Sequence, residues 1–137
     1  MSRQDVQKLD VQRLLEEYQL IGELLASLQT QYATVTELLE ELTAALDGVR
    51  ILKSGGEGRL VHIGAGLFVS GTFDTKEVLT PLGAGYHAFL DFDNAERILQ
   101  ERIEEYSKLK TTLEENIQRL AERAEQIRQI LQRLGVR

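Results

Sequence analysis

The sequence predicts an α+β fold in which a long antiparallel coiled-coil hairpin carries two β-hairpins at its centre, through which subunits assemble. Three observations predict this fold. Apolar residues recur at heptad spacing in both flanks of the chain, the centre is rich in glycine, and the centre contains an internal repeat. At 137 residues the chain is one domain's length at most. We divide that domain, residues 1–137, into residues 5–48, 49–93 and 94–134.

The N-terminal flank is predicted to form one long helix. Its apolar residues are spaced alternately three and four positions apart, which is the a/d pattern of a coiled coil. The pattern predicts a helix from Asp5 to Asp47, and Gly48 is its expected C-cap. The stripe consists of Val11, Leu14, Tyr18, Ile21, Leu25, Leu28, Tyr32, Val35, Leu39, Leu42, Leu46 and Val49.

The C-terminal flank repeats this pattern. We expect Asn94 to be the N-cap of the second helix and Gly135 to end it. Lys110 and Ala124 weaken the stripe, a defect that either sets the register or is merely tolerated. The stripe consists of Leu99, Ile103, Tyr106, Lys110, Leu113, Ile117, Leu120, Ala124, Ile127, Leu131 and Leu134.

Each stripe needs a partner, and the nearest is the other flank of the same chain. In an antiparallel pair, facing residue numbers should sum to roughly 143. This places Leu14 near Leu131 and Glu17 near Arg123. The N-terminal 50 residues carry 4 basic and 9 acidic groups, whereas residues 94–137 carry 9 and 8, so the two flanks are electrostatically complementary.

The centre holds a duplicated β element. Residues 61–75 (VHIGAGLFVSGTFDT) align with residues 80–94 (TPLGAGYHAFLDFDN), and each copy contains a Gly-Ala-Gly turn. We expect strands at 59–63, 67–73, 77–82 and 86–92, with a flexible connector at 54–58. The turns lack the third glycine, the Lys-Ser/Thr pair and the following helix of a nucleotide site, so we interpret them as hairpin turns.

A two-stranded ribbon is only marginally stable in water. The two hairpins also expose more apolar surface than a pair of helices can cover. Exposed strand edges also recruit further strands. We therefore expect the hairpins to join those of other subunits, with the coiled coils projecting away. The proposed assembly residues are Leu60, Ile63, Leu67, Val69, Phe73, Val78, Leu82, Phe89 and Phe92.

Composition excludes several classes of function. The net charge of −6 argues against nucleic-acid binding, and the lack of cysteine excludes thiolate metal sites and cysteine nucleophiles. His62 and His87 have no acidic triad nearby, and no carboxylate pair is placed for acid/base catalysis. We expect no enzyme activity, no cofactor and no metal. Without a signal peptide or a long apolar run, we expect a cytoplasmic protein with no membrane partner.

The whole chain resembles the α class of prefoldin subunits. The doubled hairpin carries the resemblance, with paired turns at 63–66 (IGAG) and 82–85 (LGAG), TFDTKEV at 72–78 and FDNAERILQERIEEY at 92–106. The resemblance implies a hexamer of two α and four β subunits, whose hairpins form an oligomeric β-barrel platform carrying six coiled coils. It also implies an ATP-independent chaperone, or holdase, that captures unfolded proteins at the coiled-coil tips and passes them to a group II chaperonin. Pro81 occupies the repeat position of His62, which leaves the strand register around Pro81 open.

Client binding is assigned to apolar residues near the free ends of the two helices, where pairing runs out. The alternative for Leu15 and Ile130 is that they only widen the helix seam. A second alternative, for the whole protein, is a structural coiled-coil scaffold that binds fixed partners and no general clients. The proposed client-binding residues are Val6, Leu9, Leu15, Leu20, Ile127, Ile130, Leu131, Leu134 and Val136.

Overall fold

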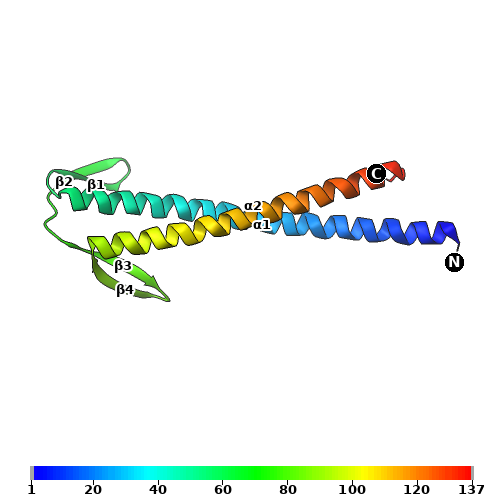
Figure 1. The fold of residues 1–137 in the computed structure, drawn as a ribbon. Helices are drawn as coiled ribbons and strands as arrows, with labels where there is room; N and C mark the ends of the chain where they lie inside the picture. The colour runs from blue at the N-terminus through cyan, green and yellow to red at the C-terminus, as the bar shows by residue number, and fades with distance from the viewer. Residues whose placement is uncertain (1, 137) are drawn as a thin grey trace. The chain divides into compact units, whose positions relative to one another are not determined.

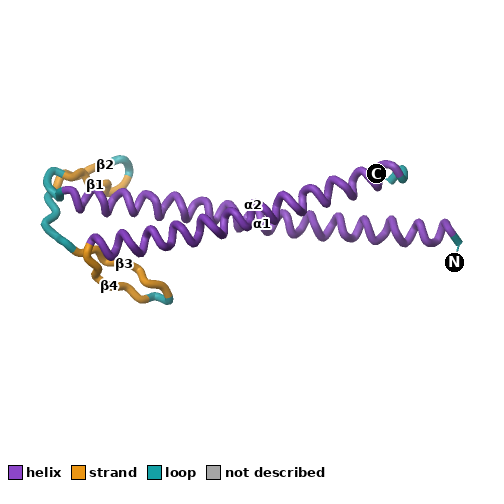
Figure 2. The backbone as a smooth tube through the Cα atoms, viewed as in Figure 1, coloured by secondary structure: helices purple, strands orange, loops and turns teal. Residues whose placement is uncertain are grey.

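In chain order, the protein consists of a long helix, four short strands and a second long helix (Figure 1). The computed structural model describes residues 2–136. Figure 2 shows the strands as two separate hairpins joined by a loop. The predicted fold class, a helical hairpin with two β-hairpins, is therefore confirmed. The elements are α1 (Arg3–Ser54), β1 (Arg59–Gly64), β2 (Leu67–Gly71), β3 (Glu77–Gly83), β4 (Tyr86–Asp91) and α2 (Phe92–Arg133).

The described chain forms two compact units. One combines residues 2–37 of the chain with residues 108–136 and contains only segments of α1 and α2. The other, residues 38–107, contains the remaining parts of both helices and all four strands. Each unit has its own apolar cluster.

In the helical unit, the seam is built from the heptad positions. Ile21, Ile127 and Leu131 are buried, and Val11, Leu14, Leu25, Leu120, Ala124 and Val136 pack around them. Leu14 and Leu131 thus share a cluster, as the register predicted. Glu17 and Arg123 also meet as predicted, with Arg123 Nε and Nη2 donating to the two carboxylate oxygens at 2.7 and 3.0 Å. The antiparallel register of this unit is therefore confirmed.

The polar residue in the second stripe has a specific partner. Lys110 is half-buried and its Nζ lies 5.4 Å from the centroid of the Tyr32 ring. The Tyr32 hydroxyl donates a hydrogen bond of 2.9 Å to Glu114. Lys110 is thus part of a polar layer across the seam and not only a defect in it.

In the second unit, the helices and the second hairpin share one core. Leu46, Val49, Ala95 and Leu99 are buried together, and Leu42, Val78, Leu90, Phe92 and Ile103 pack against them. Val78 and Leu90 face each other across the β3–β4 ladder. This hairpin is therefore held by one of its faces against the two helices.

The first helix is longer than predicted, because Gly48 does not end it. Val49 is buried at 6% exposure against α2, and the helix continues to Ser54. The burial of the next heptad position outweighs the low helix propensity of a single glycine, roughly 1 kcal/mol. Gly55, with a φ of +148°, takes the place after the helix end that we had assigned to Gly48.

The second helix begins earlier than predicted, at Phe92. Asp91 is its N-cap, since its Oδ1 accepts a hydrogen bond of 3.0 Å from the backbone N–H of Asn94. Asn94, our expected N-cap, is therefore the third residue of the helix. The sequence offers Asp91, Asp93 and Asn94 in close succession, all good N-cap residues, so propensity alone could not choose among them.

Both hairpins are antiparallel and end in the predicted Gly-Ala-Gly turns. Each ladder has an irregularity just before its turn, between His62 and Gly64 in the first hairpin and between Pro81 and Gly83 in the second. Strand β3 runs through Pro81, which pairs with His87. A proline is tolerated there because each sheet has only two strands, so one side of β3 is unpaired.

Candidate assembly and client-binding surfaces

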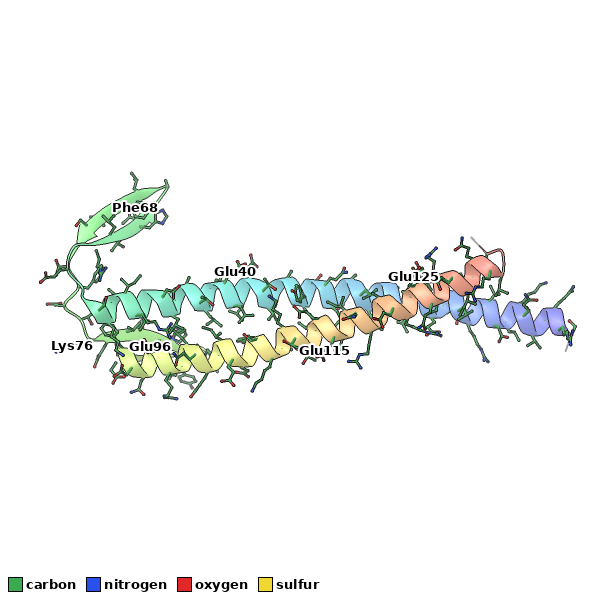
Figure 3. All side chains as sticks on the ribbon, turned by 45° about the horizontal axis from the view of Figure 1, so that its top comes forward. Glu40, Phe68, Lys76, Glu96, Glu115 and Glu125 are labelled. Atoms are coloured by element: carbon green, nitrogen blue, oxygen red, sulfur yellow. The ribbon has the colours of Figure 1, made fainter. Side chains whose placement is uncertain are left out.

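The first hairpin exposes apolar side chains on both of its faces. Pairing of Leu60 with Ser70 and of His62 with Phe68 places Leu60 and Phe68 on one face. Leu67 and Val69 lie on the other, and all four side chains are at least half exposed, Leu60 at 70%. Figure 3 shows Phe68 on this hairpin, away from the two helices. A ribbon with two apolar faces and two unpaired edges needs a partner to be stable.

Two sets of polar contacts hold the first hairpin at its base: one joins it to the end of α1, and the other joins the connector before β1 to the loop after β2. Arg59, at the start of β1, donates to the carbonyl oxygens of Ile51 in the last turn of α1, at 3.1 Å, and of Gly55 directly after the helix, at 2.7 Å. Gly56 accepts a hydrogen bond of 2.8 Å from the backbone N–H of Phe73. Both tethers are polar, so they position the hairpin without covering its apolar faces.

The second hairpin exposes one face only. Leu79 and Phe89 pair with each other on the face opposite the helices and are 54% and 68% exposed. Arg102 of α2 donates a hydrogen bond of 2.6 Å to the carbonyl oxygen of Pro81. This hairpin is therefore fixed to its own helices and presents a single apolar face outward.

Two of the residues assigned to assembly lie outside the strands expected for them, and a third, Val78, lies in its expected strand but faces the core. Phe73 follows the end of β2 at Gly71 and lies in the loop between the hairpins, and Phe92 is the first residue of α2. Phe92 and Val78 pack against the chain's own core. Leu60, Ile63, Leu67, Val69, Leu82 and Phe89 are exposed.

The turns explain the Gly-Ala-Gly repeat. All six turn residues have positive φ, including Ala65 at 49° and Ala84 at 51°. The flanking residues, such as Gly64 at 120° and Gly83 at 103°, occupy regions that side chains rarely adopt. Backbone geometry therefore accounts for the repeat.

The helix ends carry the predicted client-binding residues, but not all of them are available. Ile127 is fully buried and Leu131 is 7% exposed, because both fill the seam of the helical unit. Since no area of Ile127 is left for a client, we leave both residues out of the binding surface. The residues that remain exposed, here called the tip surface, are Val6, Leu9, Leu15, Leu20, Ile130 and Leu134.

The C-terminal end of α2 is closed by a Schellman motif. Val136 N–H donates to the Leu131 carbonyl at 2.9 Å and Gly135 N–H to the Gln132 carbonyl at 3.1 Å, with Gly135 at a φ of +76°. Gly135 thus ends the helix as predicted. The motif turns Val136 back against the apolar cluster, where it is half-buried.

Ion pairs shift the pKa values of charged side chains in both units. Arg123 holds the pKa of Glu17 below its ordinary value through their hydrogen bonds, and Arg128 does the same for the pKa of Glu125. In the unit that carries the hairpins, Lys53 of α1 forms an ion pair with Asp93 of α2, which raises the pKa of the lysine. These pairs join or line the helices and leave the exposed apolar residues uncovered.

Some exposed apolar residues were missed by the sequence analysis. Phe68 and Leu79 alternate with residues that we assigned to assembly, so a period-two pattern excluded them. The consecutive run Leu67, Phe68 and Val69 was the available signal, because uninterrupted apolar strands are covered on both faces. On α1, Leu24 is 44% exposed and was also missed.

Among residues 2–136 no three histidine or acidic side chains cluster in a way that could hold a metal ion. Over the same residues, neither helix contains an apolar stretch sufficient to span a membrane. The features that stand out are exposed apolar groups at the hairpins and at the helix ends.

Comparisons with known proteins agree with this arrangement. Residues 21–137 match the family model for "Prefoldin subunit". The chain is 78% identical to the "Prefoldin subunit alpha" of Pyrobaculum arsenaticum and 79% identical to that of Pyrobaculum aerophilum, over 100% of each chain. It is 32% identical to the subunit alpha of Saccharolobus islandicus, over 79% of this chain and 76% of that one.

A solved structure shares the fold. In the filamentous PFD from Methanocaldococcus jannaschii, one chain superposes with a TM-score of 0.65 at 21% sequence identity, covering 82% of this chain and 95% of that chain. The resemblance that the doubled hairpin indicated is confirmed by the relatives. The chain belongs to the prefoldin family of chaperones, whose subunits form oligomeric complexes, and over its full length it is similar to alpha subunits.

Proposed function

We propose that the chain is the α subunit of an ATP-independent holdase, which binds unfolded polypeptides at the tip surface. The observation that carries the proposal is the set of exposed apolar side chains at the helix ends, from Ile130 at 36% to Leu20 at 55% exposure. Leu134 is the exposed last member of its heptad stripe, and the other five residues lie outside the seam that the heptad positions fill, so they do not serve helix pairing. An unfolded protein exposes the apolar side chains that such a surface can cover.

Binding at one tip is expected to be weak. Apolar contact contributes on the order of 25 cal/mol per Å² before the cost of association is subtracted, and a helix end offers only a small contact area. Several tips that act on the same client raise the overall affinity, while each tip still dissociates rapidly. This combination allows capture and release without nucleotide.

We further propose that the exposed hairpin faces assemble the subunit with four β subunits and a second α subunit. The proposal is supported by the two apolar faces of the first hairpin and the single outward face of the second. Delivery of the client to a group II chaperonin in the cytoplasm completes the proposed function. Family membership supports this last step.

The test is protection of a chemically unfolded protein from aggregation, measured by light scattering without ATP. The complex is formed with its β-type partner, either with the full chain or with a variant that lacks residues 1–9 and 130–137. The full complex should suppress aggregation of unrelated test proteins, whereas the truncated complex should assemble but protect less. Full retention of protection by the truncated complex would refute the role of the tips.

A structural scaffold is the alternative outcome of the same test. A scaffold that docks only fixed partners would leave the aggregation of unrelated proteins unchanged. Dilution of the unfolded protein into the complex together with a group II chaperonin then tests delivery, because the chaperonin should acquire the client at the expense of the complex.

A further inference from the structure

The helix ends contain a groove that shares only Leu134 with the tip surface. It has a volume of about 500 Å³ and lies between the first turns of α1 and the turn after α2. We call it the tip groove, and its lining residues are Gln4, Gln7, Lys8, Val11, Leu134 and Val136. Three of these are apolar, two are neutral amides and one is a cation.

The four lining residues from α1 form one face of that helix. At about 100° per residue, Gln4, Gln7, Lys8 and Val11 fall within an arc of about 100°. Asp5 and Asp10, the two nearest acidic residues of α1, fall about 60° outside the arc, one on each side. Asp5 also accepts hydrogen bonds from the backbone N–H and the hydroxyl of Ser2, at 3.3 and 2.8 Å. Lys8 is therefore the one ionised side chain that lines the described groove.

The other wall of the groove is held by the Schellman motif and is also free of acidic residues. Residues 126–136 contain Arg128 and Arg133 and no aspartate or glutamate. Arg128 pairs with Glu125 at 2.6 Å, whereas neither Arg133 nor Lys8 has an ion-pair partner among the described residues. Arg133 is not one of the lining residues, but it directly precedes Leu134, which is. The groove thus has a cationic bias in a chain whose net charge is −6.

We propose that the tip groove binds apolar client segments that carry acidic side chains, with Lys8 and Arg133 as the specificity-determining residues. The apolar side chains of the segment cover Val11, Leu134 and Val136, and a neighbouring carboxylate pairs with the lysine or arginine. This inference rests on the proposed client binding and adds a charge preference to it. Apolar contact alone would not distinguish an acidic segment from a basic one.

The test compares three unstructured peptides of the same apolar sequence that carry two Glu, two Gln or two Lys residues. Each is labelled with a neutral fluorophore, and its affinity for the complex with the β-type partner is measured by anisotropy. The Glu peptide should bind most tightly and the Lys peptide least tightly. Salt should reduce the difference, since exposed charge pairs are screened.

A double substitution, Lys8→Gln with Arg133→Gln, isolates the groove. It should weaken binding of the Glu peptide about two- to fivefold, the effect of losing an exposed ion pair, and should leave the Gln peptide unaffected. Arg13→Gln is the matched control, because Arg13 is on the same helix at about 180° from Gln4. The control should bind all three peptides as the wild type does.

The outcomes separate this inference from the proposed function. Equal affinity for the Glu and Gln peptides, in a complex that still prevents aggregation, overturns the charge preference alone. If the double variant loses affinity equally for the Glu and Gln peptides, the charge preference is likewise overturned. Failure of the wild-type complex to bind any peptide or to protect any client overturns both proposals.

Discussion

Lys110 lies at a heptad position where the pattern favours an apolar side chain. Its ammonium group instead lies over the Tyr32 ring, and the same tyrosine donates to Glu114 of α2. A polar layer of this kind reduces seam stability but favours one register, because a shifted register would separate the charge from the ring. The sequence indicated that Lys110 was exceptional but did not identify its partner.

A double-mutant cycle tests the contact. Lys110→Met keeps the length of the side chain and removes its charge, so in the wild-type background the gain from an apolar seam residue should be reduced by about 0.5–1 kcal/mol of unfolding free energy, the value of the lost exposed cation–π contact. In a Tyr32→Leu background the same substitution should have no such cost. The measurement is chemical denaturation followed by circular dichroism. Equal effects in both backgrounds would show that the two residues are not coupled.

The Glu17–Arg123 pair makes the helical unit sensitive to acid. Arg123 lowers the pKa of Glu17 from its ordinary value of 4.5, so the folded state binds the proton of Glu17 less readily than the unfolded state. The pair therefore stabilises the fold fully above pH 4.5, and this contribution is lost as the pH falls through the lowered pKa. Glu17→Gln should lower the melting temperature at neutral pH and cause a smaller decrease in acid.

Glu23→Gln is the control for that measurement. Glu23 is exposed on the same helix and has no partner among the described residues, so its substitution should change the melting temperature little at any pH. A difference between wild type and Glu17→Gln that persists unchanged in acid would contradict the account of the pair.

At the scale of elements, heptad spacing predicted the helices and their register, because burial of an apolar stripe depends on sequence position alone. It did not predict where the helices end. Gly48 was interpreted as a terminator, but burial of Val49 extends α1, and Asp91 was preferred to Asn94 as N-cap because β4 leads directly into α2. The positions of Phe73 and Phe92 depended on those ends, so their assignment to strands was wrong.

Two glycines should respond to alanine in opposite directions. A Cβ on Gly56 would lie 1.8 Å from the carbonyl oxygen of Phe73, so Gly56→Ala must displace the loop between the hairpins. It should cost about 1–3 kcal/mol, as overpacking does, and should raise hydrogen exchange at the Phe73 amide. Gly22 lies within α1 with nothing within 4 Å of such a Cβ, so Gly22→Ala should stabilise the helix, by about 0.5–1 kcal/mol.

Hydrogen exchange and thermal denaturation of the two variants check this contrast. If the Phe73 amide were equally protected in wild type and Gly56→Ala, the close contact between the connector and the loop would not exist in solution. If Gly22→Ala lowered the melting temperature, the added methyl group would have to meet neighbouring atoms, which contradicts the open space around Gly22.

At the scale of the whole molecule, the chain separates two kinds of apolar surface. Leu79 and Phe89 on the second hairpin are exposed without being needed for the subunit's own core, and the tip residues are exposed without being needed for the helix seam. This separation supports the two proposed roles, since substitutions in the hairpins can alter assembly and substitutions at the tips can alter client binding.

Leu79→Asp with Phe89→Asp should therefore prevent assembly without unfolding the subunit. Both side chains lie on the face of β3 and β4 that points away from the core. The helical circular dichroism signal should be retained while light scattering reports smaller species. Phe92→Asp is an unsuitable substitute, because Phe92 packs against the core and its loss would unfold that unit.

The most direct test of the central claim is the native mass of the complex that forms when the chain is co-expressed with its β-type partner. The account predicts one species with two copies of this chain and four of the partner, and its loss when Leu79 and Phe89 are replaced by aspartate. A chain that remains a monomer beside its partner, or a complex unaffected by those substitutions, would contradict assembly through the hairpins.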